Sequence, residues 1–387
     1  MTRKIGNADK SQKNDHPNGW RGNPSSWCRH LCQHSHAQRG ISSLESSRRY
    51  TEPRKRALSY AILAPNPHNR QPWVVDLSQQ DLIVLHIDTD KMLPHTDPFN
   101  RQITVGLGGF LELLRMAAAE DGYHTEVEAF PQGVDPVKLD SRPIAIIAFK
   151  KDSQVQKDPL FKQVLERRSL KEPYDMTRLI PKTALARLNA LQQPDVALAS
   201  TNEPQLVDRI RKLTHTGLAI EIETPRAYKE SVDLFRIGKA EINANPDGID
   251  FSGATYESLA AAGLFNREVA LDTSSISYLE GINSLMASAD TAVAYVWLTT
   301  ETNTRVEQLN AGRDWLRINL LTTELGIGVH PMSQCLQEYS EMDKPFADMQ
   351  QLLRAEGKTI QMLGRLGYAA PVPRSPRWSI EAKIIKA

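Results

Sequence analysis

The run from Ala64 to Trp73 (Ala-Pro-Asn-Pro-His-Asn-Arg-Gln-Pro-Trp) concentrates amide side chains between prolines. One interpretation is a proline-stiffened turn between a helix and a strand. The other is a binding surface, because prolines fix the backbone and remove competing donors. Asn66, Asn69 and Gln71 would supply amide donors and acceptors to a flat heteroaromatic ligand with an amide-like edge. The residues alone leave both interpretations open.

Basic side chains gather in two segments that lie far apart in the chain. Arg167-Arg-Ser-Leu-Lys171 places three cations around a hydroxyl, and the ending Pro371-Val-Pro-Arg-Ser-Pro-Arg377 carries two more, after Arg365 in a predicted strand. Taken singly, each segment is typical of a solvated helix end or a surface tail. A strong phosphate site combines charge with several hydrogen bonds, so it would need both segments together. Each charge-assisted bond would then contribute about 1.5–3 kcal/mol.

Three weaker signals each have a structural interpretation as well as a functional one. Potential metal ligands alternate at Cys28, His30, Cys32, His34 and His36, but their spacing fits no standard zinc pattern, so no metal site is expected. Gly106-Leu-Gly-Gly109 lacks the preceding strand of a dinucleotide-binding loop, and close helix packing is the preferred interpretation. His330, directly before Pro331, is either a proton donor or a turn histidine with a structural hydrogen bond, and the second is favoured.

Composition excludes several classes of function. The 387 residues include 47 Lys and Arg and 46 Asp and Glu, for a formal net charge of +1. A near-neutral chain has no global attraction to nucleic acid or to an anionic membrane, so neither partner is expected. No run of about 18 apolar residues predicts a membrane span. Three cysteines give no disulfide framework, and a cytoplasmic location is expected.

The hydrophobic patterns predict an α+β fold. Residues 1–50 are poor in branched aliphatic residues, and a disordered extension is expected there. Helices are predicted at 54–63, 98–120, 181–191, 204–222 and 304–325. Strands are predicted at 73–77, 82–88, 124–130, 143–149, 292–299 and 359–366. The strand at 143–149 is nearly all apolar and should be central in its sheet.

An internal echo indicates duplication. When Arg101 is set against Arg305, Gly108 meets Gly312 and Gly122 meets Gly326. Apolar residues also coincide: Leu111 with Trp315, Leu114 with Ile318, and Met116 with Leu320. Two unrelated amphipathic helices can give a match of this kind, but a glycine stop and a strand follow both copies. The echo therefore favours two repeats of one α+β unit, at 51–160 and 161–387.

Together these segments resemble the nitroreductase superfamily, and more closely its fused-repeat branch, the Acg-like FMN-binding oxidoreductases. The resemblance runs from about Pro53 to the C-terminus and rests on five motifs in the family's order. They are Ala-Ile-Leu-Ala-Pro-Asn-Pro-His-Asn-Arg-Gln-Pro-Trp73, Asp97-Pro-Phe-Asn-Arg101 leading into Gly106-Leu-Gly-Gly109, Arg167-Arg-Ser169, Gly326-Ile-Gly-Val-His-Pro-Met-Ser-Gln334, and Pro-Arg-Ser-Pro-Arg377.

The resemblance implies two fused repeats that mimic the usual homodimer, each a mainly antiparallel sheet with helices, which exchange segments and hold flavin at their interface. The residues implied for the FMN phosphate are Arg168, Ser169, Lys171, Arg374 and Arg377. Those implied to line the isoalloxazine are Pro65, Asn66, Pro67, His68, Asn69 and Gln71, with Pro331, Met332 and Ser333 on its other side. The first repeat has no matching basic tail, so one FMN per chain is expected. Lys171 stands where an Arg is common.

The implied function is FMN-dependent hydride transfer from NADPH or NADH through the flavin to a small acceptor such as a nitroaromatic or quinone. No side chain need act as acid or base, so no catalytic residue is assigned. The alternatives are an FMN-binding protein without turnover, with the insert Asp247–Asn266 as a lid, or a scaffold whose flavin site is dead. A monomer or weak homo-oligomer is expected. Arg48-Arg49 lacks the apolar region that follows in this branch's export signals.

Overall fold

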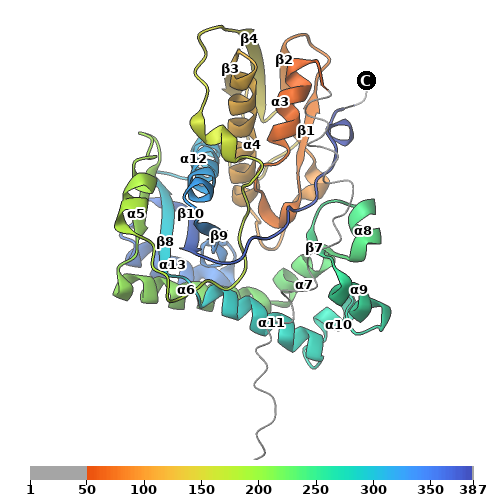
Figure 1. The fold of residues 1–387 in the computed structure, drawn as a ribbon, viewed down its shortest axis with the longest axis vertical. Coiled ribbons are helices and arrows are strands. Elements are labelled where there is room, and N and C mark those ends of the chain that lie inside the picture. Colours follow the sequence, from red (N-terminus) through yellow and green to blue (C-terminus); the bar gives the residue numbers. More distant parts are fainter. Residues whose placement is uncertain (1–49, 386–387) are drawn as a thin grey trace, which may run out of the picture.

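The computed structural model describes residues 50–385 and shows two four-stranded antiparallel sheets with the same strand order (Figure 1). The first has the order β1-β2-β4-β3, from β1 (Trp73–Asp76), β2 (Leu82–Ile87), β3 (Tyr123–Ala129) and β4 (Ala145–Lys151). The second has the order β5-β8-β10-β9, from β5 (Ala197–Thr201), β8 (Ala294–Thr300), β9 (Gly328–Pro331) and β10 (Thr359–Gly367). Both run first, second, fourth, third, so the predicted α+β fold with two repeats is confirmed, and β4 is internal as expected.

A matching set of helices accompanies the sheets. The first repeat has α3 (Pro53–Ala61) and α4 (Arg101–Glu120), and the second has α5 (Lys182–Asn189) and α12 (Arg305–Glu324). The helix predicted at 98–120 is α4, and the prediction places its start three residues too early, at Pro98. The helix begins at Arg101 because Asn100 has a left-handed backbone (φ 57°) and the Asp97 carboxylate accepts the free N–H groups of Gln102 and Ile103.

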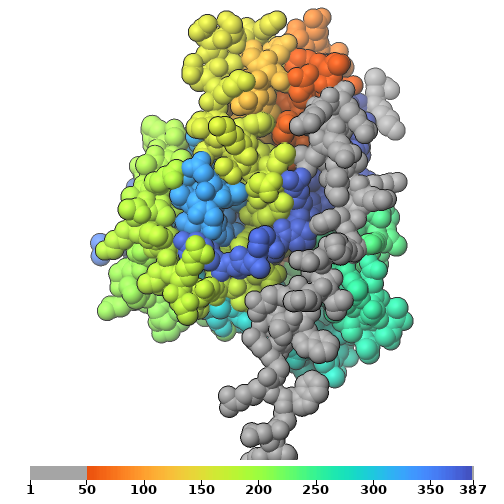
Figure 2. All heavy atoms as spheres, viewed as in Figure 1, coloured from red at the N-terminus to blue at the C-terminus, as the bar shows by residue number. Residues whose placement is uncertain are grey.

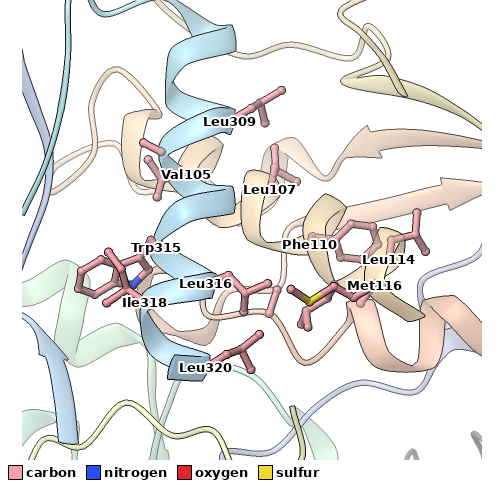
Figure 3. Close-up of a cluster of buried hydrophobic side chains, with 14 of the residues drawn as sticks. Val105, Leu107, Phe110, Leu114, Met116, Leu309, Trp315, Leu316, Ile318 and Leu320 are labelled. Atoms are coloured by element: carbon pink, nitrogen blue, oxygen red, sulfur yellow. The ribbon is translucent and has the colours of Figure 1, made fainter. Parts of the chain in front are cut away.

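Helices α4 and α12 cross in close contact between the sheets (Figure 3). A Cβ added to Gly108 would lie 2.0 Å from the Leu309 carbonyl oxygen, and one added to Gly312 would lie 1.9 Å from that of Val105. The alignment that pairs Gly108 with Gly312 also pairs Val105 with Leu309, so the two contacts are reciprocal. This agrees with the internal duplication and confirms close helix packing as the reason for Gly108, whereas Gly106 faces Asn66 of the loop.

The two aligned arginines make reciprocal contacts as well. Arg101 donates from Nη1 to the carbonyls of Ile360 and Gln361 in the second repeat, at 3.2 and 3.0 Å. Arg305 donates from Nε to the Asp135 carbonyl in the first repeat, at 3.4 Å. Each arginine thus fastens the start of its own helix to the opposite repeat.

One long insertion distinguishes the repeats. In the first repeat a turn joins β1 to β2, whereas residues 204–289 separate β5 from β8. We call this segment the insertion; it comprises α6 (Pro204–Glu223), α7 (Pro225–Asp233), β6 (Phe235–Ile237), α8 (Gly238–Ala244), β7 (Ile249–Phe251), α9 (Ala254–Ala261), α10 (Arg267–Leu271) and α11 (Ile276–Ala289). The remaining elements are α13 (Asp343–Leu352) and the 3-10 turns η1 (Pro67–Asn69), η2 (Thr89–Lys91), η3 (Pro159–Gln163), η4 (Gln334–Leu336), η5 (Ser340–Met342) and η6 (Ile380–Ala382).

The repeats exchange the segments that follow their sheets. After β4, the chain crosses to the second repeat, where Leu170 N donates to Val329 O of β9 at 2.9 Å. After β10, the tail returns to the first repeat, where Val75 N of β1 donates to Lys383 O at 2.8 Å. In Figure 2 the dark-blue tail and the yellow-green crossover lie side by side on one face. One buried core includes side chains from both repeats, among them Trp73, Leu107 and Leu316.

Within residues 50–385, no helix is long and apolar enough to cross a membrane. The predicted disordered extension and its Cys and His residues lie almost entirely outside the described residues. The predicted boundary at residue 160 falls in the crossover and stays a prediction.

Candidate functional site

The loop between α3 and β1 is held in an unusual backbone conformation. His68, Asn69 and Gln71 have φ values of 46°, 51° and 49°, in the left-handed region that side chains with a Cβ rarely adopt. Such strain costs about 1–3 kcal/mol per residue and is concentrated at binding and catalytic sites. The loop packs on α4 so closely that a Cβ on Gly106 would lie 3.1 Å from the Asn66 Cβ. This favours the binding interpretation over a simple turn.

The amide side chains of the loop hold its shape. Asn66 accepts the backbone N–H of Gln71 at 2.7 Å. Asn69 donates to the Pro376 carbonyl at 3.0 Å, and buried Gln71 donates to the Pro246 carbonyl at 2.7 Å while accepting from Trp378 N at 3.0 Å. The side-chain amides of Asn66, Asn69 and Gln71, which were predicted to contact the flavin ring, are therefore engaged in hydrogen bonds within the protein. What the loop still offers a ligand is its backbone, the faces of Pro65 and Pro67, and the half-buried His68.

The two predicted basic segments meet across the repeats. Arg168 donates from Nε to Val372 O at 3.2 Å, which fixes the crossover against the tail. Burial lowers the pKa of Arg168, and nearby Arg374 lowers it further. Burial also lowers the pKa of Arg167 to about 9, with smaller contributions from Arg377 and Arg168. Like charges held this close are unfavourable until an anion compensates them. The cluster is therefore suited to bind an anionic group.

The arginines of this cluster differ in how many donors they have free. Arg377 donates to the carbonyls of Ile62, Pro376, Leu63 and Ala64 and to Asn69 Oδ1. Its guanidinium thus caps the carbonyl end of α3 and ties the loop to the tail, which favours a structural role. Its predicted phosphate contact stays a prediction. Arg167, by contrast, is buried with no partner for Nε in the part of the chain that the structure describes.

Lys171 is the most available cation of the site. Its ammonium forms no hydrogen bond or ion pair with any residue from 50 to 385, and Ser169 Oγ likewise has no partner among those residues. Lys171 is solvent-exposed by surface area, yet desolvation lowers its pKa. Both hold for a side chain that solvent still reaches although protein atoms surround much of it. An exposed ammonium that is already poorly hydrated costs little further desolvation when an anion binds.

Three more ionisable side chains lie around Lys171. Burial, then Lys171 and Arg70, lower the pKa of His68 to about 4. Burial, then Arg365 and Lys171, lower that of His330 well below its usual value. Burial raises the pKa of Asp250, which Lys171 partly offsets. His68 comes from the first repeat, His330 from the second and Asp250 from the insertion, so all three parts of the fold meet here.

The second-repeat segment 331–333 approaches the same region from β9. Met332 is buried against Leu218, Ile222 and Ala289, so its side chain belongs to the core. Ser333 Oγ donates to Leu363 O at 3.3 Å. Any ligand contact from this segment would come from Pro331, from the Ser333 side chain or from backbone atoms.

The insertion closes over the loop. Gly248 N donates to Asn69 O at 3.3 Å, beside the Gln71 contact to Pro246. Asp247 is 1% exposed and accepts from Lys91 and Arg236, each at 2.7 Å. The predicted lid segment therefore contacts the strained loop directly.

Sequence reasoning did not assign Arg167 or Asp250 to this site, and it weighed His330 as a proton donor but favoured a structural role for it. The Arg167–Ser169 motif contained the first, but only the fold shows which of the two arginines turns inward. Asp250 carries no motif, and its place follows from the packing of the insertion. Among the described residues, no group of three or more His, Cys, Asp or Glu side chains is arranged to hold a metal ion.

No protein-family model matches the chain. It is 36% identical over 91 residues to a Mycobacterium tuberculosis protein named "Putative NAD(P)H nitroreductase acg", covering 24% of this chain and 27% of that protein. A second M. tuberculosis protein, also named as a "Putative NAD(P)H nitroreductase", is 24% identical over 343 residues, covering 83% of this chain and 87% of its own length.

Among solved structures, the FMN-dependent nitroreductase NfnB from Mycobacterium smegmatis in complex with NADPH is similar at 15% identity and a TM-score of 0.35, covering 58% of this chain and 96% of that one. A score this low carries no argument about the site. The chain spans about a quarter of the length of the first of these two relatives and most of the length of the second. With its duplicated α+β topology, the chain is thus similar to Acg-like proteins that are named as putative NAD(P)H nitroreductases.

Proposed function

We propose that this protein is an FMN-dependent oxidoreductase of the nitroreductase type. It would pass hydride from NADPH or NADH through the flavin to a small acceptor such as a nitroaromatic or quinone. The observation that carries the proposal is the meeting of three elements at the repeat interface: the cations of 167–171 and the tail, the strained loop at 64–72, and the segment after β9. The names of the relatives support the same activity.

The residues present fit an FMN phosphate. An orphaned buried donor, Arg167 Nε, and an unpaired ammonium, Lys171, are the kind of groups that a phosphate dianion satisfies. Ser169 Oγ and Arg168 stand between them in the sequence and would add a hydroxyl and a second guanidinium. Arg374, at the exposed rim 3.5 Å from Glu166, would contribute charge more than direct bonds.

Bound FMN would supply the redox chemistry, and the protein would bind, orient and shield it. The loop around Pro65 and Pro67 presents a stiff apolar surface for one side of a planar ring, with His68 kept neutral beside it. The insertion, through Pro246 and Gly248, would restrict the access of water.

One observation favours a second candidate, an FMN-binding protein without turnover. The insertion is fastened to the loop by Asp247, whose carboxylate is buried and paired with two cations. A lid held this firmly would suit retention of the cofactor more than repeated exchange of donor and acceptor.

Anaerobic reduction separates the two candidates. The FMN-loaded protein is mixed with NADPH, and in parallel with NADH, and flavin absorbance near its visible maximum is followed. Turnover predicts bleaching with at least one donor and recovery of the absorbance when a quinone or nitroaromatic is added. Flavin that binds but is not bleached by either donor would support retention without turnover. A protein that takes up no FMN would contradict both candidates.

A further inference from the structure

Arg365 on β10 lies directly opposite His330 on β9 and holds a fixed position beneath it. The pair is in register in the sheet, and Arg365 Nε lies 3.0 Å from His330 Nδ1. The guanidinium is fully buried. The two N–H groups of its Nη2 have three acceptor oxygens within hydrogen-bond distance, Lys171 O, Glu172 O and Ser288 Oγ, at 2.9, 2.8 and 2.6 Å. Its Cζ also stacks 3.9 Å from the centroid of the Tyr174 ring. So many contacts leave it no alternative orientation.

This contact determines the tautomer of His330. An arginine guanidinium has N–H donors and no acceptor. A donor directed at Nδ1 therefore needs a lone pair there, and a neutral imidazole then carries its proton on Nε2. A proton on Nδ1 would set two donors against each other beside a buried cation. The low pKa of His330 agrees, because burial, Arg365 and Lys171 all disfavour the imidazolium.

The other ring nitrogen of His330 is available to a ligand. Nε2 has no hydrogen-bond partner among residues 50–385, and the side chain is only partly buried. The unpaired Lys171 ammonium is near enough to lower the pKa of both His330 and His68. The His330 Nε2–H is thus a fixed hydrogen-bond donor beside the unpaired Lys171 ammonium, where the crossover, β9 and the loop meet.

We propose that Arg365 is a positioning residue that locks His330 as its neutral Nε2–H tautomer, and that this N–H donates to an oxygen of the bound flavin alongside Lys171. The choice of flavin as ligand rests on the proposed function; the tautomer does not. A donor of this kind cannot be converted to an acceptor without breaking the buried contact to Arg365. The position therefore selects for an acceptor oxygen on the ligand.

The tautomer is measured in the ligand-free, full-length protein by long-range proton–nitrogen NMR with labelled histidine, using His330→Gln to identify the His330 signals. The inference predicts a pyridine-type Nδ1 and a pyrrole-type Nε2 that stay unchanged from pH 8 to pH 5.5. A protonated Nδ1, or a titration with a midpoint near 6.5, would overturn it. This measurement needs no flavin, so its outcome tests the tautomer independently of the proposed function.

Two substitutions test the contact with the ligand. The shorter amide in His330→Asn keeps an acceptor near Nδ1 for Arg365 but leaves no donor at the Nε2 position, whereas His330→Gln restores a donor near that position. FMN and riboflavin affinities are measured by quenching of flavin fluorescence. His330→Asn should weaken FMN binding about tenfold, the value of one hydrogen bond, and His330→Gln should recover most of it.

The riboflavin arm locates the acceptor. Equal weakening of FMN and riboflavin by His330→Asn assigns the contact to the ring or ribityl oxygens, and weakening of FMN alone assigns it to the phosphate. Either result supports the donor role. Wild-type affinity for both flavins in a folded His330→Asn protein would refute it.

Discussion

Gly108 of α4 and Gly312 of α12 lie against each other where the two helices cross, and a Cβ on Gly312 would be 2.9 Å from the Gly108 Cα. Each glycine also lies against a backbone carbonyl of the opposite helix, Leu309 for one and Val105 for the other. Because the two residues are equivalent in the two repeats, the contact lies at the centre of a pseudo-symmetric interface. That interface is internal to a single chain.

Replacement of either crossing glycine should destabilise the whole protein. In Gly108→Ala the added methyl meets backbone atoms that cannot rotate away, so the helices must separate, at a cost of at least about 2 kcal/mol. Urea unfolding measures it. Gly281→Ala is the control, because Gly281 lies in α11 with nothing within 4 Å of its Cβ position; it should be neutral or stabilising by about 0.5–1 kcal/mol. Equal effects of the two substitutions would contradict the proposed close packing.

Lys171→Met should weaken FMN binding about ten- to hundredfold, because it removes an unpaired cation worth about 1.5–3 kcal/mol as a charge-assisted donor. It should also flatten the dependence of FMN affinity on salt. Lys162→Met, at an exposed position in η3, is the matched control and should bind FMN as the wild type does. If both variants keep wild-type affinity and salt dependence, Lys171 does not face the ligand.

The two tail arginines should separate binding from stability. Arg377→Ala removes the cap of α3 and its bond to Asn69, and it should lower the free energy of unfolding by about 2–4 kcal/mol. Arg374→Ala should leave stability unchanged and weaken FMN binding about two- to fivefold, as expected for an exposed charge. Thermal unfolding and flavin titration of both variants check this. An Arg374→Ala protein with unaltered FMN affinity would remove Arg374 from the phosphate site.

Glu221 should make stability depend on pH. Burial raises the pKa of Glu221 to about 7, against the smaller opposing effect of its bond from Gln337 Nε2. The folded protein then holds a proton that the unfolded chain releases above about 4.5, so this group lowers stability progressively from pH 4.5 to 7.

Glu221→Gln should abolish that loss of stability. The free energy of unfolding of the variant should match that of the wild type near pH 4.5 and exceed it at pH 8 by up to about 3 kcal/mol. The new amide also supplies a donor beside Gln337 Oε1, which is buried without a partner in the described part of the chain. Urea unfolding at both pH values tests this, and a variant no more stable at pH 8 than the wild type would show that Glu221 ionises freely.

Asp247→Asn should loosen the insertion. Removing the charge leaves Lys91 and Arg236 facing each other without their common carboxylate. Limited proteolysis should then cut the 245–266 region faster, and bound FMN should dissociate faster. Unchanged rates for both would mean that Asp247 does not restrain a lid.

The sequence predicted the repeated elements well because their signals are local. The glycines shared by α4 and α12 and the apolar strand at 143–149 are visible in the residues themselves. The insertion was mostly missed, since α8 and α10 have seven and five residues and are held by tertiary contacts. Strands β5 and β9 were missed because their partners, and not their own composition, hold them in a sheet.

The candidate site also combines features with local sequence signals and features that depend on tertiary contacts. Composition located the strained loop and both basic segments. It could not show that Asn69 and Gln71 use their amides internally, that Arg377 caps a helix, or that Arg167 is left with an orphaned donor. These roles depend on which backbone carbonyls the fold brings within reach.

The central claim is that cations from the crossover and the tail bind a flavin phosphate at the interface of the repeats. Titration of the wild-type protein with FMN and with riboflavin, each followed by flavin fluorescence, tests it most directly. We predict one FMN per chain, bound at least about a hundredfold more tightly than riboflavin, since the phosphate makes two or more charge-assisted bonds. Equal affinity for the two flavins, or no binding of either, would contradict the account.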